Sequence, residues 1–273
     1  MRKDTMRENL EYWLVLAVAR ALGAVPRGLA RLLAGGLAFA VYWSFGRLRR
    51  VGWRNLELAL PELPSEDKYR ILRGLVLLQA AQARGKGVLV VTGHMGAWEL
   101  SGFYLSLMGH IMSVVIRPLD NRRLDKLVND NRCLHGNRMI PKDEFGRSLL
   151  TAMRAGETVA ILMDTNMTPP QGAFVEFFGR QACTATGLAH MARKTGAAVL
   201  PGFMLWEPTE RRYVLHFGPE IEIPRTADAQ ADILAGTQLC TAAIESWIRR
   251  YPDQWLWIHR RWKTRPAGEV GLY

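Results

Sequence analysis

The residues best suited to chemistry lie between Thr92 and Leu100, in the stretch TGHMGAWEL. His94 stands between two glycines after a buried apolar run, and Glu99 follows five positions later. On one continuous helix this separation would place the two side chains roughly 140° apart. They can meet if His94 lies in a loop and Glu99 in the first turn of the next helix, and such a pair is a general base. Taken alone, the motif favours a surface histidine beside a helix-start glutamate over a catalytic pair.

Short apolar runs predict strands that are buried on both faces. They lie at residues 88–92, 113–117, 158–163 and 198–204. Helical patterns occur at residues 98–108, 122–134, 147–155 and 188–194, and a last one at 229–250 ends before Pro252. Strands that alternate with helices predict an α/β protein, in which His94 follows the first strand and precedes a helix.

Three polar residues lie where an α/β sheet presents ligand-binding groups. Arg117 ends the second strand, and its guanidinium suits a phosphate; the alternative is a surface arginine. Asp164 ends the third strand, where it would orient Arg117, bind a substrate hydroxyl or cap the turn. Thr184 precedes a predicted helix whose first amides could receive a phosphate or an oxyanion, although ordinary capping explains it as well.

Apolar side chains surround a predicted tight turn at Phe174, Phe177, Phe178 and Gly179. Each buried methylene of an acyl chain contributes about 0.8 kcal/mol, so a channel of this composition can hold a chain of about a dozen carbons or more. Core packing would give the same composition. Phe177 and Gly179 are therefore candidates for an acyl channel and for the core alike.

The charge of the chain favours an anionic partner. Its 273 residues include 36 Lys and Arg against 25 Asp and Glu, with a formal net charge of +11 and a pI of about 10.0. Nucleic acid, an acidic membrane, an acidic protein or a phosphorylated substrate would each fit this charge. The three cysteines are widely spaced and the histidines are scattered, so the sequence predicts a reducing compartment and no metal site.

The first 60 residues combine basic and apolar character. Residues 32–46 carry no charge, but as a helix they would span about 22 Å, less than the roughly 30 Å hydrocarbon core of a bilayer. Arg47, Arg49 and Arg50 follow and could meet anionic headgroups. We expect a membrane-associating apolar helical segment at residues 1–50, with a buried helical hairpin as the alternative.

Aromatic and basic side chains alternate at residues 255–263. Stacking on nucleic acid is one interpretation, but no nucleic-acid-binding motif accompanies the segment. A membrane interface or the acidic surface of a carrier protein suits the same residues. We therefore expect an anionic membrane or an acidic protein as the partner of this segment, and no nucleic acid.

Five blocks, in order, resemble the bacterial lipid A biosynthesis (late) acyltransferases, relatives of the glycerolipid acyltransferases that carry H-x4-D. The first block, GHMGAWEL at 93–100, has the H-x4-E pattern of the family. The others are VIRPLDNRRLDKLVNDNR at 115–132, ILMDTN at 161–166, the stretch 172–203, and DQWLWIHRRWKTRP at 253–266. With NLELALPEL at 55–63, the resemblance covers nearly the whole chain.

The resemblance implies an O-acyltransferase at the cytoplasmic face of the inner membrane, without a cofactor. His94 and Glu99 would act as the catalytic pair, and an acyl thioester, expected to be that of acyl carrier protein, would acylate a hydroxyl of a lipid A precursor or related glycolipid. Residues near the substrates would be Arg117, Asp164, Phe177, Gly179 and Thr184. The alternatives are a lysophospholipid or other glycolipid acyltransferase that uses acyl-CoA, and a non-catalytic membrane-binding relative.

The expected architecture is a single mixed-sheet acyltransferase domain at residues 51–273, flanked by helices, after the N-terminal segment. The sequence departs from the resemblance at Ala97, where the family usually has asparagine, and at Thr165, where glutamine is common. It is also shortened near residues 75–82, where the family has further helical turns.

Overall fold

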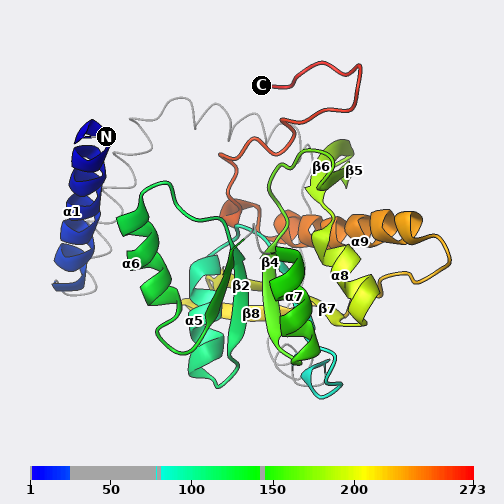
Figure 1. The fold of residues 1–273 in the computed structure, drawn as a ribbon, viewed down its shortest axis with the longest axis horizontal. Helices are drawn as coiled ribbons and strands as arrows, with labels where there is room; N and C mark the ends of the chain where they lie inside the picture. Colours follow the sequence, from blue (N-terminus) through cyan, green and yellow to red (C-terminus); the bar gives the residue numbers. More distant parts are fainter. Residues whose placement is uncertain (1, 25–77, 79–80, 142–144) are drawn as a thin grey trace.

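The fold is described from a computed structural model that covers residues 2–24, 78, 81–141 and 145–273. A mixed sheet of six strands forms the centre of the molecule, and Figure 1 shows several of these strands side by side. Its order is β3-β2-β4-β1-β7-β8. The strands are β1 (Val88–Thr92), β2 (Met112–Ile116), β3 (Arg138–Pro141), β4 (Thr158–Leu162), β7 (Ala198–Glu207) and β8 (Arg212–Phe217). The first five are parallel, and β8 runs antiparallel to β7. The expected mixed α/β sheet is therefore confirmed.

Helices cover both faces of this sheet. Leu89 and Val91 of β1 belong to the core shared with α7 (Phe145–Arg154), α8 (Gly187–Thr195) and α9 (Ala229–Arg250). Val88 and Val90 point to the opposite face, where the core includes Leu105 of α5 (Trp98–Leu107). Because alternate side chains of a strand point to opposite faces, a strand between two helical layers must be apolar throughout. This explains the uninterrupted apolar runs in the sequence.

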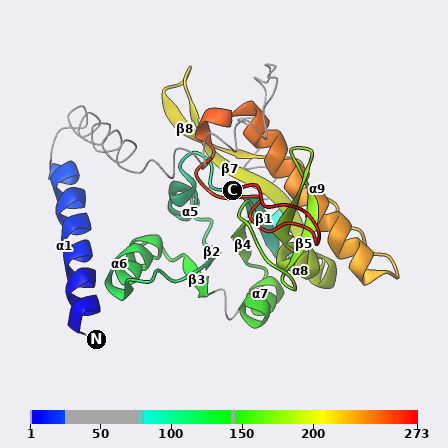
Figure 2. The same ribbon diagram turned by 90° about the horizontal axis from the view of Figure 1, so that it is seen from above.

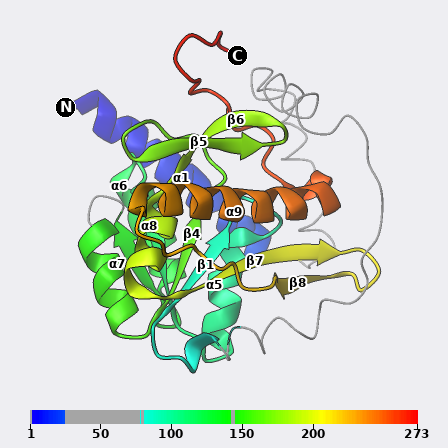
Figure 3. The ribbon, with the colours of Figure 1, turned by 90° about the vertical axis from the view of Figure 1, so that its right-hand side faces the viewer.

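A two-stranded hairpin, β5 (Gly172–Phe177) and β6 (Arg180–Ala185), packs on α9. Figure 3 shows α9 between this hairpin and β7. The turn consists of Phe178 and Gly179, whose φ angles are 52° and 69°. Glycine adopts this left-handed region without strain, so Gly179 serves the turn.

The N-terminal helix α1 (Arg2–Ala24) lies beside α6 (Arg122–Arg132) at one side of the molecule (Figure 1, Figure 2). The side chain of Asn121, which caps α6, also donates to the carbonyl of Glu8 at 3.0 Å. Within the part of the chain that the structure describes, no helix is long and apolar enough to cross a membrane. Residues 32–46 and most of the shortened segment at 75–82 lie outside the described residues.

The C-terminal segment that follows α9 packs into the protein. Trp255, Trp257 and Trp262 are buried in the main core, and Arg261 is fully buried. The expectation that these four side chains form a membrane or carrier-protein surface was therefore wrong. Their alternation with polar residues reflects a chain whose aromatic side chains turn inward.

Candidate active site

His94 and Asp164 form a hydrogen-bonded pair beyond the carboxyl ends of two strands. Nδ1 of His94 lies 2.8 Å from Oδ1 of Asp164, and the backbone amide of His94 donates to Oδ2 at 2.7 Å. The indole Nε1–H of Trp255 donates to the same Oδ2 at 2.8 Å. Asp164 is buried, whereas 26% of the His94 side chain is exposed. Because Nδ1 faces the carboxylate, Nε2 is the ring nitrogen that can take a proton from a bound molecule.

The register of β1 and β4 brings these two residues together. Thr92 and Leu162 are partners in the parallel pairing, and His94 and Asp164 each follow two positions later. Gly93 allows their close approach, because a Cβ at this position would lie 3.0 Å from Cγ of Asp164. The small residue beside the histidine therefore has a packing role.

The electrostatics of the pair favour an ionised Asp164 and a basic His94. Burial would lower the pKa of His94, but the hydrogen bond and charge of Asp164, and then the charge of Glu99, raise the pKa above its ordinary value. Burial would likewise raise the pKa of Asp164, but its hydrogen bonds and charge interaction with His94, together with the bond from Trp255, hold the pKa below its usual range. A histidine in this setting is suited to accept a proton near neutral pH.

Glu99 lies in the first turn of α5 and His94 in the preceding loop, as the sequence predicts. The expected hydrogen bond between them is replaced by other contacts. The Glu99 carboxylate accepts from Nε and Nη2 of Arg132, at 2.9 and 2.5 Å, while Asp164 holds the imidazole. The buried carboxylate bound to Nδ1 is therefore Asp164, and Glu99 acts on His94 through its charge.

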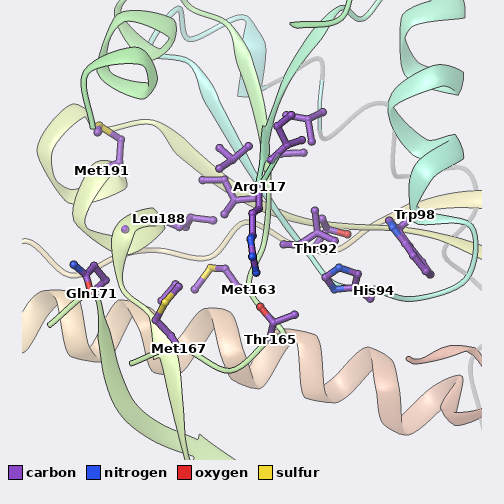
Figure 4. A pocket seen from close by; sticks show the side chains of 18 of the residues that line it. Thr92, His94, Trp98, Arg117, Met163, Thr165, Met167, Gln171, Leu188 and Met191 are labelled. Atoms are coloured by element: carbon purple, nitrogen blue, oxygen red, sulfur yellow. The ribbon is translucent and has the colours of Figure 1, made fainter. Parts of the chain in front are cut away.

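A cleft of about 1890 Å³ opens beside this pair. His94, Glu99, Arg117 and Arg132 line one part of it. Figure 4 shows Met163, Met167, Leu188 and Met191 on the other side of Arg117 from His94, and these four also line the cleft. The cleft thus joins a charged part beside His94 to an apolar part beside α8.

Arg117 is placed as the sequence predicts, one residue beyond β2 and in the wall of the cleft. Its side chain is 80% exposed, and Nη2 lies 3.6 Å from Asp120. Asp164 follows the neighbouring strand β4 but does not orient Arg117, because the carboxylate of Asp164 turns to His94 and Trp255. An ion pair this exposed contributes little, so the guanidinium is available to an anionic ligand.

Of the other three candidate residues, Phe177 and Thr184 are buried in the core, and Gly179 lies in an exposed turn. Phe177 is fully buried against Trp255 and Trp262, and it is not among the residues that line the cleft. The hydroxyl of Thr184 is fully buried and accepts a hydrogen bond from Arg261. For these two residues the packing interpretation fits the structure, whereas Gly179 serves the turn between β5 and β6 through its positive φ angle. The apolar lining of the cleft comes instead from other side chains, among them Met167, Leu188 and Met191.

Sequence reasoning missed three residues around the pair: Arg132, Trp255 and His259. Nε2 of His259 accepts the amide N–H of Asn166 at 2.8 Å, and His259 also lines the cleft. Burial lowers the pKa of His259, and the charges of Arg261 and His94 add to this effect against the opposing charge of Asp164. Arg132 and both C-terminal residues lie within blocks that resemble the family, but nothing in their spacing indicates contact with His94, Asp164 or Glu99.

Comparison with known proteins identifies the family of the chain. Residues 72–264 match the family described as bacterial lipid A biosynthesis acyltransferase. The chain is 32% identical over 207 residues to the lipid A biosynthesis palmitoleoyltransferase of Escherichia coli (strain K12), covering 76% of this chain and 65% of that protein. It is 26% identical over 293 residues to the lipid A biosynthesis lauroyltransferase of the same organism, covering 96% of this chain and 94% of the relative.

A lipid A biosynthesis acyltransferase of Haemophilus influenzae is 28% identical over 213 residues, which again cover 65% of its length. The chain thus spans slightly less than two thirds of some relatives and nearly all of another. The family match includes His94, Glu99, Arg117, Asp164 and the C-terminal segment to residue 264. The chain belongs to the bacterial lipid A biosynthesis acyltransferase family.

Proposed function

We propose that this protein transfers a fatty acyl group from an acyl thioester to a hydroxyl of a lipid A precursor. The observation that carries the proposal is the His94–Asp164 pair at the edge of a large cleft whose lining is partly apolar and partly cationic. A thioester with a long chain and a phosphorylated glycolipid together need both kinds of surface.

In the proposed reaction, Nε2 of His94 takes the proton of the acceptor hydroxyl as its oxygen attacks the thioester carbonyl. The carbon–oxygen bond of the new ester forms, the carbon–sulfur bond breaks, and the imidazolium returns the proton to the leaving thiolate. Asp164 holds the ring through Nδ1 and stabilises the imidazolium. Glu99, held by Arg132, supplies a second negative charge beside the ring. No covalent acyl-enzyme is required.

The two parts of the cleft suit the two substrates. Arg117 would bind a phosphate of the acceptor, because an exposed guanidinium can donate two parallel hydrogen bonds to it. The apolar part around Met167, Leu188 and Met191 would hold the acyl chain. We propose acyl carrier protein as the thioester carrier; acyl-CoA is the alternative.

We further propose that the protein works at the cytoplasmic face of the inner membrane, where α1 meets an anionic lipid surface. Met6, Leu10, Trp13 and Leu14 are exposed on α1 at helical spacing. The other side of the helix contacts α6 through Glu8 and Tyr12. An apolar stripe that the body of the protein leaves uncovered is suited to an interface between lipid and water.

A transfer assay with the purified full chain tests the proposal. The acceptor is lipid A precursor isolated from bacteria without their own late acyltransferases, and the donors are lauroyl thioesters of acyl carrier protein and of CoA. Mass spectrometry should show one added acyl chain with the wild type and almost none with His94→Ala. If neither donor yields product above the His94→Ala background, the non-catalytic membrane-binding alternative replaces this proposal.

A further inference from the structure

The C-terminal segment after α9 contacts both loops that carry the His94–Asp164 pair. On the β1 side, the amide of Leu256 donates to the carbonyl of His94 at 3.0 Å. The amide of Gly96 donates to the carbonyl of Gln254 at 2.8 Å. Met95 and Trp255 form an isolated antiparallel bridge at the same place. The backbone around the histidine is therefore fixed by this segment.

The same segment contacts each of the three residues that follow Met163 after β4. Trp255 donates to the carboxylate of Asp164 at 2.8 Å, and Nη1 of Arg261 lies 3.3 Å from the carbonyl of Thr165. His259 accepts the amide N–H of Asn166. Thr264 exchanges two hydrogen bonds of 2.9 Å with the Asn166 side chain. Side chains about 90 to 100 positions away thus determine where Asp164 can lie.

Burial makes these contacts rigid. Trp255 is 5% exposed, and its ring packs against Phe177 and Trp257. Arg261 is fully buried, donates to the carbonyl of Cys183 at 2.9 Å, and lies 4.9 Å from the centre of the Phe177 ring. Buried hydrogen bonds of this kind specify one arrangement, because a donor or acceptor left unpaired in the core is costly.

We infer that residues 254–264 form a clamp that fixes the catalytic pair, with Trp255 and His259 as positioning residues for transfer. Trp255 orients the Asp164 carboxylate toward His94, and His259 fixes the following loop through the amide of Asn166. Neither residue exchanges a proton with the substrate in this scheme. The inference rests on the proposed acyl transfer. It states that residues 254–264, which are distant in sequence from His94 and Asp164, set the geometry on which proton transfer depends.

Trp255→Phe tests the first contact, because it removes the indole N–H and keeps an aromatic ring. Without this donor the charge of Asp164 is less neutralised and acts more strongly on the imidazolium. We expect kcat to fall about tenfold with KM for both substrates within about twofold, as befits the loss of one hydrogen bond to a charged group. The acidic limb of the pH–rate profile should move to higher pH. The other groups that act on this pair are Glu99, His259 and Arg261, and all remain in the variant.

Trp257→Phe is the matched control. Trp257 lies in the same segment and packs edge-to-face against Trp255, but its Nε1–H donates to the carbonyl of Pro252, away from the pair. It should lower thermal stability about as much as Trp255→Phe and leave the acidic limb in place. If both variants lose kcat equally and neither moves the limb, Trp255 is only a packing residue and the inference is overturned.

His259 is tested by two substitutions that differ in the ability to accept a hydrogen bond. Gln places an amide oxygen close to the position of Nε2, whereas Leu leaves the amide of Asn166 without this acceptor. We expect His259→Leu to lower kcat about tenfold and His259→Gln to recover most of it. Equal activity in the two variants would remove His259 from the clamp. The activity of each variant is compared with that of an active wild type. A wild type without acyl transfer would instead refute the proposed function, so the two failures can be told apart.

Discussion

The carboxylate of Glu99 is held by the guanidinium of Arg132 through two hydrogen bonds, although both side chains line the cleft beside His94. The H-x4-E motif therefore does not form a closed pair by itself. Its histidine finds a buried carboxylate on a neighbouring strand, and its glutamate is anchored by α6. Two carboxylates of different burial act on one imidazole, and they can be distinguished by mutation.

The first prediction concerns the coupling of His94 with Asp164. His94→Ala should lower the transfer rate roughly 10² to 10⁴-fold, because a positioned general base contributes this much. Asp164→Asn should cause a loss of similar size, and the double variant should lose little more than His94→Ala alone. Glu99→Gln should cost less than Asp164→Asn. Rates of all four variants, measured with folding checked by circular dichroism, decide the matter; additive losses for His94 and Asp164 would mean that they act separately.

The second prediction is the pH dependence of transfer. Only neutral His94 can take the hydroxyl proton, and Asp164 raises the pKa of its imidazolium above the ordinary value. Activity should therefore fall as the pH drops through this raised pKa. In Asp164→Asn the raising effect of the carboxylate disappears while burial still favours the neutral ring, so the acidic limb should move to lower pH. Profiles of kcat/KM for both proteins test this, and an unmoved or upward-shifted limb would contradict it.

The third prediction concerns Arg117 and the acceptor. Arg117→Lys keeps the charge but loses the guanidinium fork, so KM for the phosphorylated acceptor should rise several-fold, up to about tenfold, with a smaller effect on the donor. Most of this loss should vanish with an enzymatically dephosphorylated acceptor. Arg122→Lys, the same change at an exposed position that does not line the cleft, serves as the control. An equal penalty with and without phosphate would assign Arg117 a structural role.

The fourth prediction concerns acyl-chain preference at Met167. Met167→Phe narrows the apolar part of the cleft and should favour lauroyl over myristoyl and palmitoleoyl donors, whereas Met167→Ala should shift preference toward the longer chains. One buried methylene contributes about 0.8 kcal/mol, so each should change relative rates roughly fourfold. The same two substitutions at exposed Met108, outside the cleft lining, are the controls. Competition among the three donors provides the measurement, and unchanged ratios would place the acyl chain elsewhere.

The fifth prediction concerns membrane binding by α1. Leu14→Glu puts a charge into the exposed apolar stripe and should weaken partitioning into vesicles that contain anionic lipid. The reason is that moving a carboxylate into the boundary between headgroups and acyl chains costs free energy. Val270→Glu introduces the same charge at another exposed apolar position and should have little effect. Co-sedimentation with vesicles gives the comparison. If both variants bind as strongly as the wild type, α1 does not carry the interaction.

Local sequence patterns were sufficient to predict those strands in which apolar residues dominate the whole strand. The runs that became β1, β2, β4 and β7 are apolar because both faces of these strands are buried, and each was predicted to within one residue at its start. The short edge strand β3, the strands of the β5–β6 hairpin and the edge strand β8 were missed. Their exposed and buried positions are mixed, so no uninterrupted apolar run marks them.

The sequence by itself determined the α/β class, the family, and the placement of His94 in a loop and Glu99 in the first turn of a helix. Only the tertiary structure decided which carboxylate binds the imidazole. In the sheet, β4 lies between β1 and β2, so the residue after β4, Asp164, reaches His94 while Arg117 is one strand further away. Strand order depends on long-range packing, and so does the clamp from residues 254–264. Neither leaves a periodic signal in the residues near the site, because the contacts join positions 70 or more apart.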